Sequence, residues 1–221
     1  TLLSVDRYTG GDEFENLVTT DTAKVTVNDT IDNTTLTLAD VIVDEGSGTA
    51  TISATLTSAP TDAPLVVTLD NGSTVTFAVG STTATSTPFT IQGEDVYKDA
   101  SQTLVKVDTY TGGDEFENLV TSDTATVTVN DTIDNTTLTL NDVTVDEGSG
   151  TATITATLTA APTDAPLVVT LNNGSTVTFA VGSTTATSTP FDIQGEDVYK
   201  DASETLLSVD RYTGGDEFEN L

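Results

Sequence analysis

Hydrophobic and polar residues alternate along much of the chain with a period of two. The clearest case is Ala50, Ile52, Ala54 and Leu56, which are separated by Thr and Ser. Because successive side chains of a β-strand point to opposite faces of a sheet, this alternation predicts a strand with one buried face. No stretch of useful length has the spacing of an amphipathic helix. The pattern therefore predicts an all-β protein.

Seven segments of this kind occur within about 100 residues, with turn-forming residues between them. We expect strands at 36–43, 50–56, 65–69, 74–79, 85–91, 103–110 and 124–129. Seven short strands in this length are typical of an immunoglobulin-like β-sandwich. The expected core consists of Ile52, Leu56, Val67, Val75, Phe77, Phe89, Val105, Val107, Val127 and Val129, with Phe116 and Leu119 closing one end.

One turn is predicted in more detail than the others. Asp70-Asn71-Gly72-Ser73 stands between two expected strands. Asn-Gly tolerates the positive φ angles of a type I′ turn, so we expect a hairpin with that turn.

The whole pattern repeats with a period of 102 residues. Residues 1–102 recur as 103–204 with 12 substitutions, and residues 1–17 return unchanged as 205–221. A near-identical repeat of domain length indicates tandem β-sandwiches of about seven strands, joined end to end. We expect residues 1–33 to be the last strands of a preceding repeat plus a linker, 34–135 a complete repeat, and 136–221 a second repeat without its last strand. The chain begins in the middle of this pattern, which indicates a part of a longer protein.

The second repeat is therefore expected to have an open sheet edge. An unpaired edge invites strand addition. If this edge is completed at all, we expect Val18–Asn28 of another molecule to complete it. The neighbouring repeats of the same chain are the other expected partners.

Charge and composition narrow the range of functions. The chain has 35 acidic and 6 basic residues, a net charge of −29, so nucleic acid and anionic membrane surfaces would repel it. It has neither Cys nor His, which excludes disulfides, Cys-based zinc sites and the usual general base. No apolar run approaches the ~20 residues of a membrane-spanning helix. Divalent cations are the natural partners of such a chain.

The acidic residues are expected to gather where one repeat meets the next. In a seven-strand sandwich successive loops alternate between two poles, so the turn after 36–43, the loop before 103–110 and the end of 124–129 share the pole that faces the following repeat. Carboxylates crowded there need a counter-ion, and oxygen ligands without His or Cys suit Ca²⁺, with Mg²⁺ as the second choice. The alternative is a solvated acidic surface. The candidate metal ligands are Asp29, Asp32, Asp44, Glu45, Glu94, Asp95, Asp99, Asp114, Glu115, Glu117, Asp131, Asp134, Asp146, Glu147, Asp164, Glu196, Asp197, Asp201, Asp216 and Glu217.

Four motifs carry a resemblance to a known family. They are Val43-Asp44-Glu45-Gly46-Ser47-Gly48-Thr49-Ala50, Gln92-Gly93-Glu94-Asp95-Val96, Gly113-Asp114-Glu115-Phe116-Glu117-Asn118-Leu119 and Val129-Asn130-Asp131-Thr132-Ile133-Asp134. With these motifs the repeat resembles the extender repeats of giant RTX adhesins, which are type I-secreted proteins on the surface of Gram-negative bacteria, of biofilm or ice-binding type. The resemblance implies immunoglobulin-like modules that bind Ca²⁺ within and between them and hold a terminal adhesive domain away from the cell. It also implies an extracellular, cell-surface location.

Two other functions compete with a spacer. The exposed row Thr49, Thr51, Ser53 and Thr55 could contact ice, a sugar or a partner surface, which would make the repeat a ligand-binding module. Acidic pairs such as Asp114 and Glu117, or Glu94 and Asp95, could serve as the acid and base of a glycosidase. Adjacent acids on a strand point to opposite faces, and a duplicated active site would be unusual. We therefore expect the chain not to be an enzyme.

Overall fold

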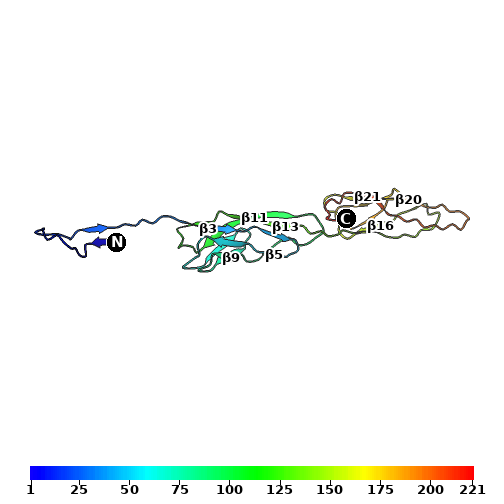
Figure 1. The fold of residues 1–221 in the computed structure, drawn as a ribbon. Helices are drawn as coiled ribbons and strands as arrows, with labels where there is room; N and C mark the ends of the chain where they lie inside the picture. Colours follow the sequence, from blue (N-terminus) through cyan, green and yellow to red (C-terminus); the bar gives the residue numbers. More distant parts are fainter.

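The structure, a computed structural model, describes all of residues 1–221. It is elongated: an N-terminal segment stands apart at one end, and two larger units follow in line (Figure 1). Every regular element is a β-strand, which confirms the prediction of an all-β protein. The structure has no helix long and apolar enough to cross a membrane.

Two main sheets build the first unit. One has the strand order β4-β13-β11-β7-β8 and the other β12-β3-β6-β9, while β5 and β10 form a separate pair. The strands are β3 (Asn33–Leu38), β4 (Val41–Asp44), β5 (Thr49–Ala50), β6 (Ser53–Leu56), β7 (Leu65–Leu69), β8 (Thr74–Phe77), β9 (Thr83–Thr85), β10 (Phe89–Thr90), β11 (Ser101–Thr111), β12 (Asn118–Val120) and β13 (Thr124–Asn130).

Both sheets contribute to one hydrophobic core of 13 buried residues. Seven of the expected core residues belong to it, Phe89, Val107, Phe116 and Leu119 pack against it, and Val129 is buried outside it. The core also contains residues that the expectation omitted, among them Leu36, Leu38, Leu65 and Leu69. Leu65, Val67 and Leu69 alternate on the buried face of β7, as period-two strands require.

Three of the expected strands are divided in the structure. The expected strand 36–43 breaks at Ala39-Asp40, so that β3 pairs antiparallel with β6 whereas β4 pairs parallel with β13 in the other sheet. Asp40 accepts a hydrogen bond from the amide of Thr126 at 2.6 Å, which holds the crossing against β13. The segment 85–91 is interrupted before β10 by Pro88, which has no amide proton to donate to a ladder. The segment 50–56 divides into β5 and β6, and between them the amide of Ile52 donates to Ser86 Oγ.

The predicted type I′ turn is wrong. Such a turn needs positive φ at both central residues, and Gly72 (φ +83°) is the only residue of Asp70–Ser73 in that region. The amide of Gly72 donates to Leu69 O at 2.9 Å and the amide of Leu69 donates to Ser73 O at 2.8 Å. These bonds define a three-residue loop in which a type I turn is followed by a glycine bulge.

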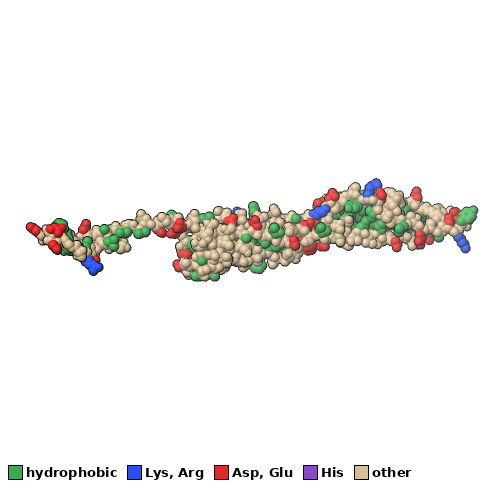
Figure 2. Space-filling view, in the orientation of Figure 1, with side chains coloured by type: hydrophobic (Ala, Val, Ile, Leu, Met, Phe, Trp, Pro, Cys, Tyr) green, Lys and Arg blue, Asp and Glu red, His purple; other side chains and the backbone are tan.

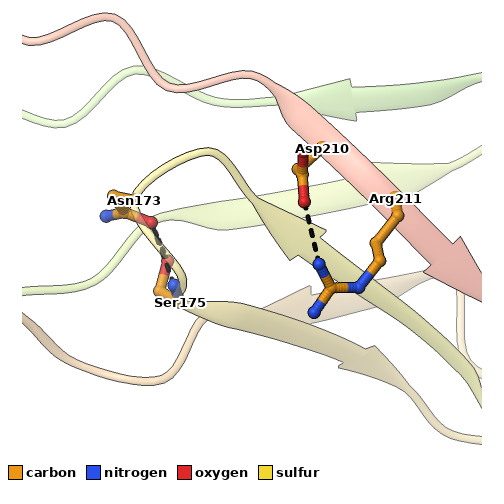
Figure 3. Close-up of polar contacts among 4 residues, drawn as sticks. All are labelled: Asn173, Ser175, Asp210 and Arg211. Atoms are coloured by element: carbon orange, nitrogen blue, oxygen red, sulfur yellow. Dashed lines mark hydrogen bonds and ion pairs between the residues drawn. The ribbon is translucent and has the colours of Figure 1, made fainter.

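The corresponding turn of the second unit has the same form. There the Ser175 hydroxyl donates to Asn173 Oδ1 at 2.7 Å (Figure 3). The same figure shows the ion pair of the structure, in which Arg211 contacts the exposed Asp210.

The second unit repeats this plan with fewer strands. Its sheets have the orders β14-β16-β19 and β18-β17-β21, with β15 and β20 as a separate pair, around a core of 8 buried residues. No strand corresponds to β4, β12 or β13. The strands are β14 (Leu138–Leu140), β15 (Thr151–Ala152), β16 (Thr155–Leu158), β17 (Leu167–Leu171), β18 (Thr176–Phe179), β19 (Thr185–Thr187), β20 (Phe191–Asp192) and β21 (Val209–Thr213).

The N-terminal segment contains one short antiparallel pair, β1 (Leu2–Ser4) and β2 (Thr22–Lys24). Leu3 pairs with Ala23, the register in which Val105 of β11 pairs with Ala125 of β13. Its apolar side chains have no core to enter, and Val27 is 88% exposed. Here β2 pairs with β1 of its own chain, and the addition of Val18–Asn28 to a second molecule stays a prediction.

Candidate metal centre at the joint between repeats

Three carboxylates from distant parts of the sequence meet at the end of the first unit that faces the second. Glu45 lies in the turn after β4, Asp99 in the loop before β11, and Asp131 just beyond β13. One carboxylate oxygen of each lies within 4.8 Å of the others. The three loops that were expected to share this pole therefore do converge.

Strand pairing brings these residues together. In the parallel ladder of β4 and β13, Asp44 stands opposite Asn130, and the amide of Glu45 donates to Asn130 O at 2.9 Å. The chain then turns at Gly46 (φ +72°), where an added Cβ would lie 2.9 Å from the Cβ of Glu94. Glycine is required here on both counts, because φ is positive and Glu94 packs against the turn.

Glu45 is buried, with 3% of its surface exposed. Its carboxylate accepts hydrogen bonds from the amide of Thr132 at 3.0 Å and from Gln92 Nε2 at 3.1 Å, and Gln92 Nε2 also donates to Asp99. The bond from Thr132 lowers the pKa of Glu45. Burial, together with the charges of Glu94 and Asp131, outweighs that bond, so the pKa lies above its ordinary value. A nearby positive charge would relieve this cost.

A fourth carboxylate, Glu219 of the second unit, lies close to Asp131 but outside the group of three. Glu219 Oε2 accepts a hydrogen bond from the amide of Asp134, while Glu219 Oε1 is buried without a hydrogen-bond partner. Burial, followed by the closeness of Asp131 and Asp134, raises the pKa of Glu219. Glu219 was absent from the candidate ligands. The signal that could have identified it is its place in the acidic motif beside Asp216 and Glu217.

We call the contact region between the units the joint, which comprises residues 96–99, 131–136, 161–163 and 216–220. Main-chain pairing crosses it: the amide of Lys98 donates to Glu217 O at 2.8 Å, and the amide of Glu219 donates to Val96 O at 3.1 Å. Lys98 Nζ donates to Asp216 O at 3.0 Å. Figure 2 shows acidic side chains at the joint and at both ends of the molecule, with few basic side chains among them.

The other candidate ligands do not form a further group of three. Several have structural contacts: Asp44 accepts from Asn130 Nδ2, Glu94 from the Thr132 hydroxyl, Asp95 from the amide of Tyr97, Glu115 from the amide of Thr61, Glu117 from the amide of Asp32, Asp197 from the amide of Tyr199, and Glu217 from the amide of Thr163. Outside the group lie Asp29, Asp32, Asp114, Asp134, Asp146, Glu147, Asp164, Glu196, Asp201 and Asp216. The ligand role of all these residues stays a prediction.

The copy of this site in the second unit is open. Glu147, which corresponds to Glu45, is exposed, although Gly148 still packs against Glu196, with an added Cβ 2.9 Å from the Cβ of Glu196. No residues of the chain occupy the positions that Asn130–Thr132 take in the first unit. The glycine turn is thus built locally, whereas burial of the glutamate depends on the last strand and the linker.

An all-β chain of repeated units, with carboxylates concentrated where the units meet, is typical of a structural module. The chain belongs to the LapA domain family, whose model matches residues 32–132 and again residues 134–221. LapA is a large adhesin, so membership indicates a module of a cell-surface adhesin and a surface or extracellular location. A search of the curated proteins found no match to the chain.

Proposed function

We propose that the chain is a spacer of a cell-surface adhesin of the RTX type, in which tandem immunoglobulin-like sandwiches are held in line by Ca²⁺ at each joint. Two sheets around one core, the repetition at 102 residues and the elongated shape in Figure 1 support the spacer role. In this role the repeat spans distance, and a terminal adhesive domain elsewhere in the protein makes the attachment.

The observation that carries the proposal is the group Glu45, Asp99 and Asp131. Beside Asp131 lies Glu219 of the next unit, whose Oε1 is buried without a hydrogen-bond partner. Carboxylates this close repel one another unless a cation or protons neutralise them. A cation here would lie beside the contact between the units, because Asp131 is close both to the other two carboxylates of the group and to Glu219 of the second unit.

The donor set fits calcium. Every candidate ligand is an oxygen, and Ca²⁺ takes six to eight oxygen ligands in flexible geometry, whereas Mg²⁺ keeps more of its water. Glu45, Asp99 and Asp131 would hold the ion, which would supply the positive charge that these residues lack, and Glu219 would face it from the side of Asp131. Extracellular calcium modules have Kd values of about 10⁻⁴ to 10⁻³ M. Such sites would be empty in the cytosol and filled outside, which suits a type I-secreted chain that folds after export.

Scattering and thermal melting of the 221-residue chain, with calcium and with chelator, test this function. With calcium we expect a narrower range of inter-unit orientations and a higher melting temperature for the first unit. At a calcium concentration about 100 times Kd the stabilisation is ~2.7 kcal/mol per site. If neither shape nor melting temperature responds to calcium, the joint is not a calcium site and the acidic surface serves solubility alone.

We also propose that the open edge of the second unit accepts Val18–Asn28 of a second molecule. In the first unit β13 fills this place between β11 and β4, and residues 22–28 match 124–130 except for Lys24 in place of Thr126. Sedimentation tests the addition: the chain should form head-to-tail assemblies as its concentration rises. Deletion of residues 1–28 should abolish them, and a monomer at all concentrations would contradict the addition.

A further inference from the structure

The joint contains an aromatic contact in addition to its carboxylates. The ring of Tyr97, from the loop before β11, stacks on the ring of Phe218 of the second unit, with centroids 5.6 Å apart and planes at 24°. The Tyr97 hydroxyl donates to Ala161 O of the second unit at 2.8 Å. Tyr97 and Phe218 also stand opposite each other in an isolated antiparallel bridge. One side chain thus contacts two separate loops of the neighbouring unit.

The repeat itself shows what this contact buries. Phe218 is 2% exposed and does not belong to the core of the second unit, whereas Phe116, its copy at the free end of the first unit, is half-buried. On the other side of the contact, Tyr97 and Val96 are half-buried, but their copies Tyr199 and Val198 are 74% and 91% exposed. Docking of the two units covers Phe218 and one side of Tyr97, whereas at Tyr199 and Val198 the next unit, the last strand and the linker are all missing.

Both halves of the contact are formed without the partner. The amide of Tyr97 donates to Asp95 Oδ1 at 2.8 Å, and at the free end the amide of Tyr199 donates to Asp197 Oδ1 at 2.7 Å. The glycine turn that precedes Phe218 is likewise present before Phe116, where Gly113 O accepts from the Phe116 amide at 3.0 Å. Preformed surfaces lose little conformational freedom when they dock.

We propose that Tyr97 with Phe218 and Ala161 forms a docking surface that orients one repeat on the next without a cation, its partner being the pole of an adjoining copy of the repeat. Stacked aromatic rings and a hydroxyl-to-carbonyl bond involve no ionised group, so this contact persists when the carboxylates of the joint are unneutralised. One consequence of this docking surface rests on the proposed spacer function: the two units keep a preferred relative orientation before calcium stiffens the joint.

Spin-label distances between the two units test this surface in the whole chain. Because the chain has no Cys, Thr85→Cys and Thr187→Cys introduce the only thiols, at matching exposed positions on β9 and β19. The measurement is made in chelator. We expect one dominant distance, and Tyr97→Ala should lower the ratio of docked to undocked orientations roughly tenfold or more, because it removes both the stacking and the hydroxyl bond.

Two variants serve as comparisons. Tyr199→Ala makes the same change at the free end and should leave the distances as they are. Tyr97→Phe keeps the ring and removes the bond to Ala161 O. It should therefore lower the ratio of docked to undocked orientations less, by roughly threefold.

Each outcome separates this proposal from the calcium proposal. An unchanged distance distribution in Tyr97→Ala, or a broad distribution in the unmodified chain that narrows only with calcium, overturns the docking surface and leaves the calcium site standing. A single distance in chelator that Tyr97→Ala broadens supports the docking surface, and the response of the melting temperature to calcium then decides the calcium proposal separately.

Discussion

The two repeats have nearly the same sequence, but their strands differ where one lacks a partner. In the first unit β11 runs from Ser101 to Thr111, pairing with β13 over its first half and with β7 over its second. In the second unit the corresponding strand, β21, is confined to Val209–Thr213, the half that pairs with β17. The residues that match β4 are not a strand there, and Val143 is 46% exposed. Strand formation at these positions is therefore decided by the neighbouring strand rather than by the local sequence.

The same difference reaches the candidate metal site. Glu45 is 3% exposed because Asn130 and Thr132 cover it, whereas Glu147 is exposed. Without the last strand and the linker that follows it, one sheet edge is open and the corresponding glutamate is exposed. The comparison can be tested in two ways: by adding the missing last strand to the second unit, and by removing a carboxylate from the site in the first unit.

The largest effect is expected from supplying the missing strand. A chain extended after Leu221 by a copy of residues 120–135 should gain about 3–5 kcal/mol of stability in its second unit, since Val127, Val129 and Ala125 are all buried in the first. Hydrogen exchange should show new protection at residues 203–208. An extension in which the copies of Val127 and Val129 are Asp is the matched control. Equal protection with both extensions would show that burial of the added strand is not the cause of the difference between the two units.

Removal of one carboxylate from the joint should have the next largest effect. At calcium concentrations of about 100 times Kd, Glu45→Gln should cost the first unit up to ~2.7 kcal/mol, because the bound ion loses a ligand. Glu147→Gln, at the open copy of the site, should change the calcium-dependent melting little. Melting curves of both variants with and without calcium measure how much of the calcium-dependent stabilisation each substitution removes. Equal losses in the two variants would contradict a site that depends on the last strand.

A glycine change is expected to affect both units equally, because the glycine has the same backbone contact in each. Gly112 and Gly214 both have φ of +84°, and an added Cβ would lie 2.5 Å and 2.6 Å from Pro64 O and Pro166 O respectively. Gly112→Ala and Gly214→Ala should each cost about 2 kcal/mol, measured as the shift in denaturant midpoint. Gly72→Ala, with φ of +83° and open space around it, should cost about half as much. If Gly214→Ala has no effect, the second unit does not close its sheet at this pole.

The sequence predicted the units and their buried faces better than it predicted the connections. Alternation identifies Ile52, Ala54 and Leu56 because each lies on one strand with one buried side. The break in the first strand also has a signal, a change of phase: Leu36 and Leu38 are even-numbered, whereas Val41 and Val43 are odd-numbered. That change marks the point where the chain crosses from one sheet to the other.

The joint has no comparable signal. The acidic motifs predicted that Glu45, Asp99 and Asp131 would gather, since loop alternation places them at one pole. The burial of Glu219 Oε1 depends on how the second unit meets the linker, and therefore Glu219 was not among the candidates. Tyr97 and Phe218 are far apart in the chain, and neither lies in an alternating segment that would pair them.

The smallest expected effect is a pH dependence of the stability of the first unit, which is measured without divalent cations. Although the amide of Thr132 lowers the pKa of Glu45, burial and the charges of Glu94 and Asp131 leave that pKa above its ordinary value. A carboxyl group with a raised pKa in the folded state binds its proton more tightly there than in the unfolded chain. The stabilisation from this proton is therefore complete below the ordinary pKa and is lost as the pH rises through the raised pKa.

The unmodified chain should accordingly lose stability relative to Glu45→Gln as the pH rises above the ordinary carboxyl pKa and through the raised pKa of Glu45. Melting of the first unit in chelator at several pH values measures this difference, and Glu147→Gln is the matched control at the open copy of the site. A difference between the unmodified chain and Glu45→Gln that does not change with pH would mean that the last strand and the linker do not bury Glu45 in solution. The contrast between the two units would then lie in strand pairing alone.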